Sequence, residues 1–497
     1  MTRLAPAALA ALFVVLAAAF AAHQSVWVDE TTQLTGLAMP FGEQLAWLTG
    51  APRPETGVPP DRMPPLSYWL GGLWAAVFGL SEPAMRLFGI ACAAAAVPAL
   101  WLAGRRVSGA WGGAFAAVAV MLSANALGAA SAIRAYPLFL ALTAWAALAY
   151  LRIALDGVTG GRLAVLGALL VAASYAHFYG LVAAFALFGS LVLLGLGRRG
   201  RSGAVVLAGL ATGLLAVGVV PFATAAAGVE APGAAPGLRE VAAGAVRLAY
   251  RLVAHPVHLG AGGLQIAHLA AVGACGIAAL WAARAAGRML AALVLPLALG
   301  FAALAGAALA GPAFDVFAPH YNLWMLPFPG LILALALRGG TVGAVLAAAV
   351  AATTLWAAAV LVRHAPLYAN GPGDWAAAQL GATGTLVIHD GAGDWAWLYF
   401  PLFWRSGGAI VQWHEAPDGT LARIVPGGLA PIADAAGERA GYAAVVLARS
   451  FSLDSRALGQ IARGRASCAD FAAAPMAAGR AARFCALAGT TLVWERP

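Results

Sequence analysis

The stretch that decides the fold is residues 27–69. It begins Trp27-Val28-Asp29-Glu30 and ends Asp61-Arg62-Met63-Pro64-Pro65-Leu66-Ser67-Tyr68-Trp69. The stretch follows an apolar run, residues 4–22, so its acids are expected on an outer loop at the mouth of a membrane helix. Only 10% of the chain is charged, and adjacent acids at such a place need a reason. They are either a solvated carboxylate pair at a helix end or a catalytic base that faces a membrane-embedded substrate.

The composition is that of a polytopic α-helical membrane protein. Hydrophobic residues make up 62% of the 497 residues, whereas soluble globular domains contain roughly 45 to 50%. The apolar runs have the length of membrane-spanning helices and do not alternate as barrel strands do. The net charge of +9 fits membrane topology and contact with anionic membrane lipids. No DNA-binding motif is present, so nucleic acid is not an expected partner.

Arginine-rich loops set the predicted topology, because cytoplasmic loops carry an excess of basic residues. Such loops recur after every second apolar helix, at Arg105 and Arg106, Arg152 and Arg162, Arg198, Arg199 and Arg201, Arg284 and Arg288, and Arg338. The sequence therefore predicts about 11 crossings, at 4–22, 84–103, 109–127, 136–153, 161–176, 178–196, 203–221, 263–283, 289–310, 320–338 and 340–362. The first run is expected to be an uncleaved anchor rather than a cleaved signal peptide, and the odd number of crossings then places the C-terminus outside. The short apolar segment 65–79 is predicted to lie along the outer surface.

The composition changes near residue 362. Residues 1–362 form the predicted transmembrane domain, with outer loops at 23–83 and 224–262. Residues 363–497 alternate apolar strands with Ala-rich helical stretches, which is typical of a small α/β domain, here outside the membrane. Because oxidation is possible outside the membrane, Cys468 and Cys485 are expected to form a disulfide. The alternative is two reduced buried thiols.

Five motifs then follow one another in a recognisable order. They are Trp27 to Glu30; Asp61 with Pro64, Pro65, Leu66 and Tyr68; Arg134-Ala135-Tyr136; Tyr175-Ala176-His177-Phe178-Tyr179-Gly180; and Pro319-His320-Tyr321 with Pro327 and Pro329. In this order they resemble the GT-C fold glycosyltransferases, in particular the group similar to glycosyltransferase family 39. That group includes protein O-mannosyltransferases, the lipid A aminoarabinose transferase and galacturonosyltransferases. In two places the chain departs from the pattern: no acid precedes Arg134, and His320 replaces an arginine, which makes that charge titratable.

The resemblance implies an inverting transferase that moves a hexosyl or pentosyl group from a polyprenyl-phosphate donor to a lipid, glycan or protein acceptor. The expected location is the outer face of a bacterial inner membrane. Asp29 is the candidate general base, with its pKa raised by the adjacent acid and by partial burial. Glu30 and Asp61 are candidates to orient it, to bind acceptor hydroxyls, or, together with Asp29, to hold a divalent metal ion. The metal remains optional, and no other cofactor is expected.

Cationic side chains on the outer side are candidates to stabilise the donor phosphate: Arg134, Arg247, Arg251 and His320. The remaining candidate substrate-binding residues are Tyr136, His177, Tyr179 and Tyr321. Each assignment has a simpler alternative. Arg134 at a helix start is also placed to snorkel to the membrane surface. Arg247 and Arg251 share one helix face that suits anionic headgroups, and His177 is also typical of a hydrogen-bonded helix end.

A transporter or flippase for lipid-linked glycans is the competing functional class. Transporters place ionisable residues near the middle of the bilayer and contain internal repeats. In this sequence the acids gather on one outer side, and no repeat relates the two halves. These features favour the enzyme.

Overall fold

The structure, a computed structural model, describes residues 4–24, 26–51, 53, 58, 60–195, 201–227, 236–254, 262–311, 316–365, 384–390, 396–406, 408–416, 418–425, 428–442, 444–451, 481–483 and 490–496. Contacts divide the chain into two compact units. The helical unit contains Met1–Ala21, Arg62–Val257 and Gly263–Val360, and the second unit contains Ala22–Asp61, His258–Gly262 and Leu361–Pro497. The first outer segment thus groups with the C-terminal domain, whereas the sequence analysis joined it to the transmembrane part. Cys468 and Cys485 lie outside the described residues.

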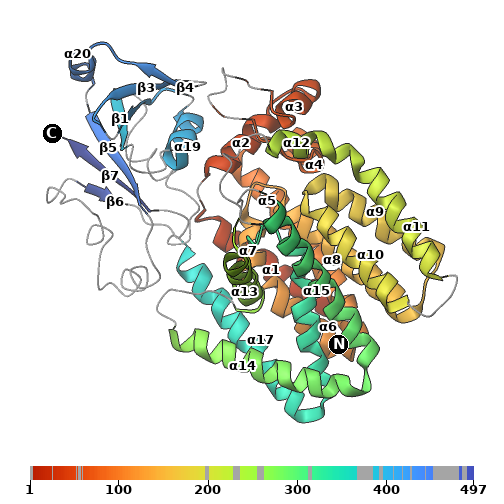
Figure 1. The fold of residues 1–497 in the computed structure, drawn as a ribbon. Coiled ribbons are helices and arrows are strands. Elements are labelled where there is room, and N and C mark those ends of the chain that lie inside the picture. Colours follow the sequence, from red (N-terminus) through yellow and green to blue (C-terminus); the bar gives the residue numbers. More distant parts are fainter. Residues whose placement is uncertain are drawn as a thin grey trace. The chain divides into compact units, whose positions relative to one another are not determined.

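The helical unit is built from apolar helices (Figure 1). Its longer elements are α1 (Ala5–Ala21), α4 (Leu66–Phe78), α5 (Glu82–Ala94), α6 (Ala96–Met121), α7 (Ala124–Ser131), α8 (Tyr136–Asp156), α9 (Gly160–Ala176), α10 (Tyr179–Gly195), α11 (Arg201–Ala216), α12 (Val220–Ala227), α13 (Leu238–Val253), α14 (Gly262–Ala282), α15 (Gly287–Ala310), α16 (Pro327–Ala334) and α17 (Gly340–Arg363). Short 3-10 turns flank some of them, among them η4 (Leu323–Met325) and η5 (Leu335–Arg338). Within the described residues, 6 helical stretches are long and apolar enough to cross a membrane.

One of these stretches, Glu82–Met121, reverses direction within α6. Ser108 and Gly109 have non-helical backbone angles, and a Cβ built on Gly104 would lie only 2.2 Å from the carbonyl oxygen of Gly112. Residues eight apart in a straight helix are separated by about 12 Å, so α6 is a helical hairpin. With this reversal, and with the shorter apolar helices Ala5–Ala21, Gly160–Ala176, Tyr179–Gly195 and Leu323–Arg338, the helices correspond to the predicted crossings.

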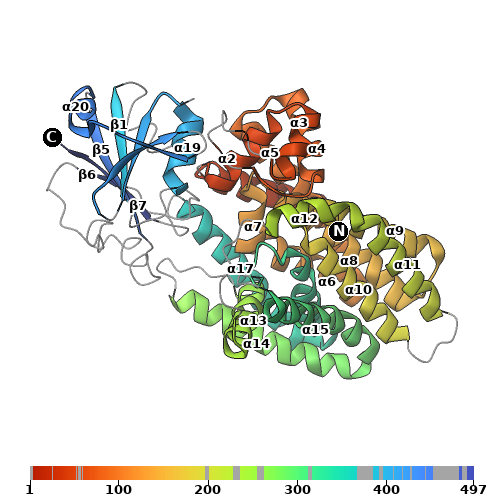
Figure 2. The ribbon, with the colours of Figure 1, turned by 45° about the horizontal axis from the view of Figure 1, so that its top comes forward.

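Helix α8 is the central helix of this unit. It contacts α5, α6, α7, α9, α10 and α15, and Figure 2 shows it between its neighbours α6, α9 and α10. Its sequence is apolar on every side, as expected for a helix that other helices surround. Because Tyr136 is the first residue of α8, the packing of this helix fixes the position of the Tyr136 side chain.

The second unit contains a mixed sheet of strands β1 (Thr385–Asp390), β2 (Val411–Glu415), β3 (Leu421–Val425), β4 (Gly428–Pro431), β5 (Ala444–Phe451), β6 (Ala481–Arg483) and β7 (Thr490–Arg496). The strand order is β4-β3-β2-β1-β5-β7-β6. Strand β1 runs parallel to β2 and β5, and the outer pairs are antiparallel. Helix α19 (Ala396–Ser406) connects β1 to β2, and α20 (Ala435–Ala440) precedes β5. Leu386, Ile388 and Trp413 form the core, which confirms the predicted α/β domain.

A buried polar network joins β1, β2 and α19. The side-chain nitrogen of Gln412 donates to the carbonyl of Tyr399 at 3.2 Å, which turns the amide oxygen toward Nε2 of His389, 2.8 Å away. His389 therefore donates from Nε2 as a neutral imidazole. Burial lowers the pKa of His389 to about 4, although the hydrogen bond to Gln412 acts in the opposite direction.

Candidate functional site

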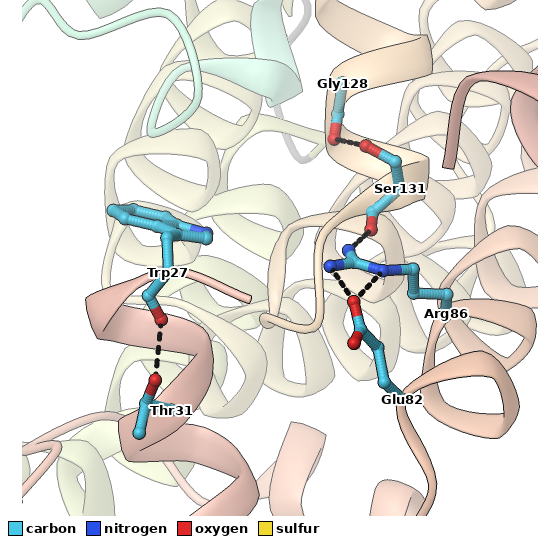
Figure 3. A network of polar contacts seen from close by, with 6 residues as sticks. All are labelled: Trp27, Thr31, Glu82, Arg86, Gly128 and Ser131. Atoms are coloured by element: carbon cyan, nitrogen blue, oxygen red, sulfur yellow. Dashed lines mark hydrogen bonds and ion pairs between the residues drawn. The ribbon is translucent and has the colours of Figure 1, made fainter. Parts of the chain in front are cut away.

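The acidic pair stands at the start of a short helix, α2 (Val28–Leu37), rather than on the predicted loop. Trp27 is the N-cap residue, so Asp29 and Glu30 occupy the first turn, where the exposed N–H groups and the helix dipole favour negative charge. The hydroxyl of Thr31 donates to the carbonyl of Trp27 at 3.0 Å, as Figure 3 shows. Thr32 makes the equivalent bond to Val28, also at 3.0 Å. These backward bonds fix the turn that carries both acids.

Glu30 is fully buried, whereas Asp29 is half-buried. Within the second unit α2 packs against α19, and Figures 1 and 2 both show the two helices side by side. Burial lowers the pKa of Arg405 on α19, and the charge of Glu30 opposes that shift. Glu30 is therefore within electrostatic reach of a cation from the C-terminal domain. Asp29 is the more accessible carboxylate of the pair, as a proton acceptor must be.

Asp61 closes the acidic segment, and it is half-buried. The residue that follows, Arg62, has a φ of 51°, in the left-handed region that non-glycine residues seldom occupy. No group of three or more His, Cys, Asp or Glu side chains among the described residues is arranged to hold a metal ion. Asp29, Glu30 and Asp61 thus make up no such three-ligand group, and a metal ion held by fewer of them stays a prediction.

The helical unit gathers five aromatic side chains from three separate segments. Tyr136 begins α8, His177 and Tyr179 lie at the turn from α9 to α10, and His320 and Tyr321 precede η4. The ring centroid of Tyr136 lies 5.8 Å from that of His177 and 5.3 Å from that of His320. The ring of Tyr321 lies 5.5 Å from His177 and 5.4 Å from Tyr179. We call these residues the ring cluster.

Hydrogen bonds hold the segment that carries His320 and Tyr321. The hydroxyl of Tyr179 donates to the carbonyl of Val316 at 3.0 Å. The buried side-chain amide of Asn322 donates to the carbonyls of Val316 and Ala318, at 2.9 and 3.0 Å. Asn322 escaped the sequence analysis, although an amide within an apolar segment is itself a signal, because a buried polar group must be hydrogen-bonded.

His177 is neutral in this cluster. Burial lowers its pKa to about 3, and the charges of His320 and Arg134 lower it further. Its ring stacks on Phe139 with centroids 5.1 Å apart. Two other groups here can carry a positive charge: His320, an exposed member of the ring cluster, and Arg134, which is buried.

Helix α13 carries the other two candidate arginines. Its residues Val241, Gly244, Leu248 and Leu252 form a buried stripe, and Arg247 and Arg251 are exposed. A Cβ built on Gly244 would lie 2.5 Å from the ring of Phe317, so α13 packs closely on the segment that leads to His320. The ring contacts do not include the two arginines, which present their charges on the outer face of this amphipathic helix.

No protein-family model matches the chain, and no curated protein matches it. The solved structure of ArnT from Cupriavidus metallidurans bound to undecaprenyl phosphate superposes with a TM-score of 0.53 and 13% sequence identity, over 98% of this chain and 97% of ArnT. The apo state of ArnT superposes with a TM-score of 0.51 and 14% identity, over 97% of each chain. The chain has the GT-C fold. This confirms the fold class that the order of the motifs predicted.

One pair of residues in this GT-C fold was missed by the sequence analysis. Glu82 and Arg86 form a buried ion pair in the first two turns of α5, with a nitrogen-to-oxygen distance of 2.6 Å, and Figure 3 shows the pair beside Ser131. Acidic and basic residues four apart are neighbours on one helix face. In an apolar helix such a spacing is a signal for a buried pair, because isolated charges are costly there.

Proposed function

We propose that this chain is a glycosyltransferase that moves a sugar from a polyprenyl-phosphate donor to an acceptor hydroxyl or amine at the membrane. The observation that carries the proposal is the ring cluster, which includes His320, together with the nearby Arg134 in a GT-C fold. The solved ArnT structure with this fold holds undecaprenyl phosphate, which supports a donor of the same chemistry. Hexosyl and pentosyl donors both fit the proposal.

The donor phosphate is assigned to Arg134 and His320. As the bond between the sugar and the phosphate breaks, negative charge grows on the departing phosphate oxygen, and nearby cations lower the energy of that state. Arg134 is buried, so its charge acts in an environment of low dielectric, where electrostatic interactions are stronger than in water. Arg247 and Arg251 on the exposed face of α13 are assigned to the lipid side, where they attract donor and membrane headgroups.

The acceptor side is assigned to Asp29. Its carboxylate removes the proton from the acceptor, and the acceptor atom then forms a bond to the anomeric carbon of the sugar. The bond from that carbon to the phosphate oxygen breaks, and the polyprenyl phosphate leaves with the electron pair. A single displacement of this kind inverts the anomeric centre. Glu30, buried against α19, is assigned to orient the helix that carries the base, and Asp61 to the acceptor hydroxyls.

The test uses the full chain in nanodiscs with a panel of undecaprenyl-phosphate sugars. Lipid mass spectrometry then measures the release of undecaprenyl phosphate with membrane extracts as the acceptor source. We expect at least one donor to lose its sugar, and Arg134→Ala to slow this loss. The control is Arg106→Ala, since Arg106 forms an exposed pair with Asp156 at the other end of α8. If no donor is consumed, and the protein in sealed proteoliposomes instead moves a fluorescent lipid-linked sugar across the bilayer, the chain is a flippase.

A further inference from the structure

The buried pair Glu82 and Arg86 makes a third contact, to the segment that carries Arg134. Nε and Nη2 of Arg86 donate to Oε1 of Glu82 at 2.9 and 2.6 Å. Nη1 of Arg86 donates to the carbonyl oxygen of Ser131 at 2.5 Å. The two side chains are only 6% and 8% exposed, so these bonds are shielded from water. Figure 3 shows the guanidinium between the carboxylate and the carbonyl.

Helix α5 touches the same segment at a second point. Gly89 follows Arg86 by three residues and therefore lies on the same helix face. A Cβ built on Gly89 would lie 2.8 Å from the carbonyl oxygen of Ala130, 3.1 Å from that of Ala132 and 3.3 Å from Pro137. The segment between residues 130 and 137 is thus held at its start by Arg86 and along its length by the bare backbone of Gly89. Arg134 and Tyr136 lie inside that segment.

The ion pair of Glu82 and Arg86 is better explained by a role in positioning residues 130–137 than by a contribution to the stability of the fold. A buried ion pair adds little net stability compared with packed apolar side chains, because both charges lose their hydration. An apolar residue at position 86 would fill the same space, but it would not bind the carbonyl of Ser131. A charged donor aimed at one carbonyl is directional, and Glu82 fixes that direction through two bonds to the guanidinium.

We propose that Glu82 and Arg86 are positioning residues that, together with the close approach at Gly89, set the place of Arg134 and Tyr136 in the donor site. This inference rests on the proposed function, in which Arg134 faces the donor phosphate. Only four residues separate Ser131 from Tyr136, and Arg134 is one of them, so a shift of the carbonyl of Ser131 moves the guanidinium of Arg134. Misplacing a binding group by about 1 Å reduces activity by up to roughly a hundredfold.

The test measures the affinity of full-length protein in nanodiscs for undecaprenyl phosphate. The double variant Glu82→Met with Arg86→Met removes both buried charges together and preserves the side-chain length. We expect it to keep its melting temperature and to bind roughly tenfold to a hundredfold more weakly, as Arg134→Ala does. Adding Arg134→Ala to the double variant should cause no further loss, because the pair acts through Arg134. The control, Arg106→Met with Asp156→Met, removes an ion pair at the other end of α8 and should bind normally.

A second variant reaches the same segment without changing any charge. Gly89→Ala adds one methyl group against the carbonyls of Ala130 and Ala132 and should weaken binding in the same way. Gly72→Ala in α4 is its control, because no atom lies within 4 Å of a Cβ there. If Arg134→Ala weakens binding while the folded double variant or Gly89→Ala does not, the positioning role is wrong and the proposed function stands. Losses that multiply in the triple variant also contradict it. If Arg134→Ala binds normally, the phosphate role of Arg134 and this inference both fail.

Discussion

The backbone N–H of Tyr179 donates a hydrogen bond to Nδ1 of His177 over 3.3 Å. A neutral imidazole has one N–H, so an acceptor at Nδ1 places the proton on Nε2. The lowered pKa of His177, about 3, keeps the ring in that neutral form throughout the physiological range. His177 can thus offer one hydrogen bond from Nε2, and it cannot offer a positive charge.

The first prediction separates that hydrogen bond from the packing of the ring. His177→Phe keeps a ring that can stack on Phe139 but has no N–H, whereas His177→Gln supplies an N–H without a ring. If the Nε2 proton contacts the donor, the Phe variant should lose roughly tenfold or more in kcat/KM, and the Gln variant should lose less. Equal losses in the two variants would show that only the packing of the ring matters.

The second prediction concerns the base. Asp29→Asn should leave folding and undecaprenyl phosphate binding unchanged and should lower turnover on the order of a hundredfold or more, the usual contribution of a general base. Glu30→Gln should have a smaller effect if that residue orients α2. Single-turnover rates with a radiolabelled donor measure the difference. A nearly normal rate for Asp29→Asn, together with an inactive Asp61→Asn, would transfer the role of base to Asp61.

The third prediction concerns His320, which stands where the glycosyltransferases that the chain resembles have an arginine. An ordinary histidine loses its charge as the pH rises through about 5 to 8, whereas an arginine keeps its charge. If the charge of His320 attracts the phosphate, donor affinity should fall over this range in the wild type and stay constant in His320→Arg. Arg134 and His177 also face this group, but neither changes its charge over that range. A parallel decline in both proteins would exclude His320 as its cause.

The fourth prediction concerns acid stability. The pKa of His389 is about 4 in the folded state, below the ordinary value of roughly 6.5, so the folded protein favours the neutral ring. The free energy of unfolding is therefore highest above about pH 6.5. It decreases as the pH falls toward 4, by an amount on the order of 3 kcal/mol. Thermal unfolding of the full chain should show this decrease. His389→Gln should be less stable at pH 7 and should depend less on pH between these limits.

The fifth prediction concerns topology. A periplasmic reporter enzyme fused after residue 365 should be active only if the end of α17 lies outside the cytoplasm, as the arginine-rich loops predict. A fusion within the turn of α6, after Gly109, should be inactive. Activity of the second fusion together with inactivity of the first would reverse the orientation and place the ring cluster on the other side.

Much of the helical unit was predictable, because its signals are local. The turn in α6 follows Arg105 and Arg106, and the apolar lengths on either side specify two crossings. The ring cluster was also within reach of sequence reasoning, since Tyr136, His177 and Tyr321 each lie at a helix end marked by a motif. Their contacts with one another depend on how α8, α9, α10 and η4 pack, which no single motif specifies.

Two other features were not predicted correctly from the sequence. Asp29 and Glu30 were expected on a loop, but they lie in the first turn of α2, where the helix dipole favours negative charge. Glu82 and Arg86 were overlooked because the partner of the pair, the carbonyl of Ser131, belongs to the backbone. A backbone acceptor leaves no mark in the composition of the chain.

The packing of α2 against α19 has a consequence for the biosynthesis of the protein. The two helices lie side by side, although one is near the beginning of the chain and the other is near its end. At a synthesis rate of about 5 to 20 residues per second, roughly 20 to 75 seconds separate their appearance from the ribosome. During that interval the helix that carries Asp29 and Glu30 lacks its contact with α19, so the acidic unit is incomplete. We therefore expect the proposed enzyme to become competent for catalysis only after the domain that contains α19 has been translated and folded.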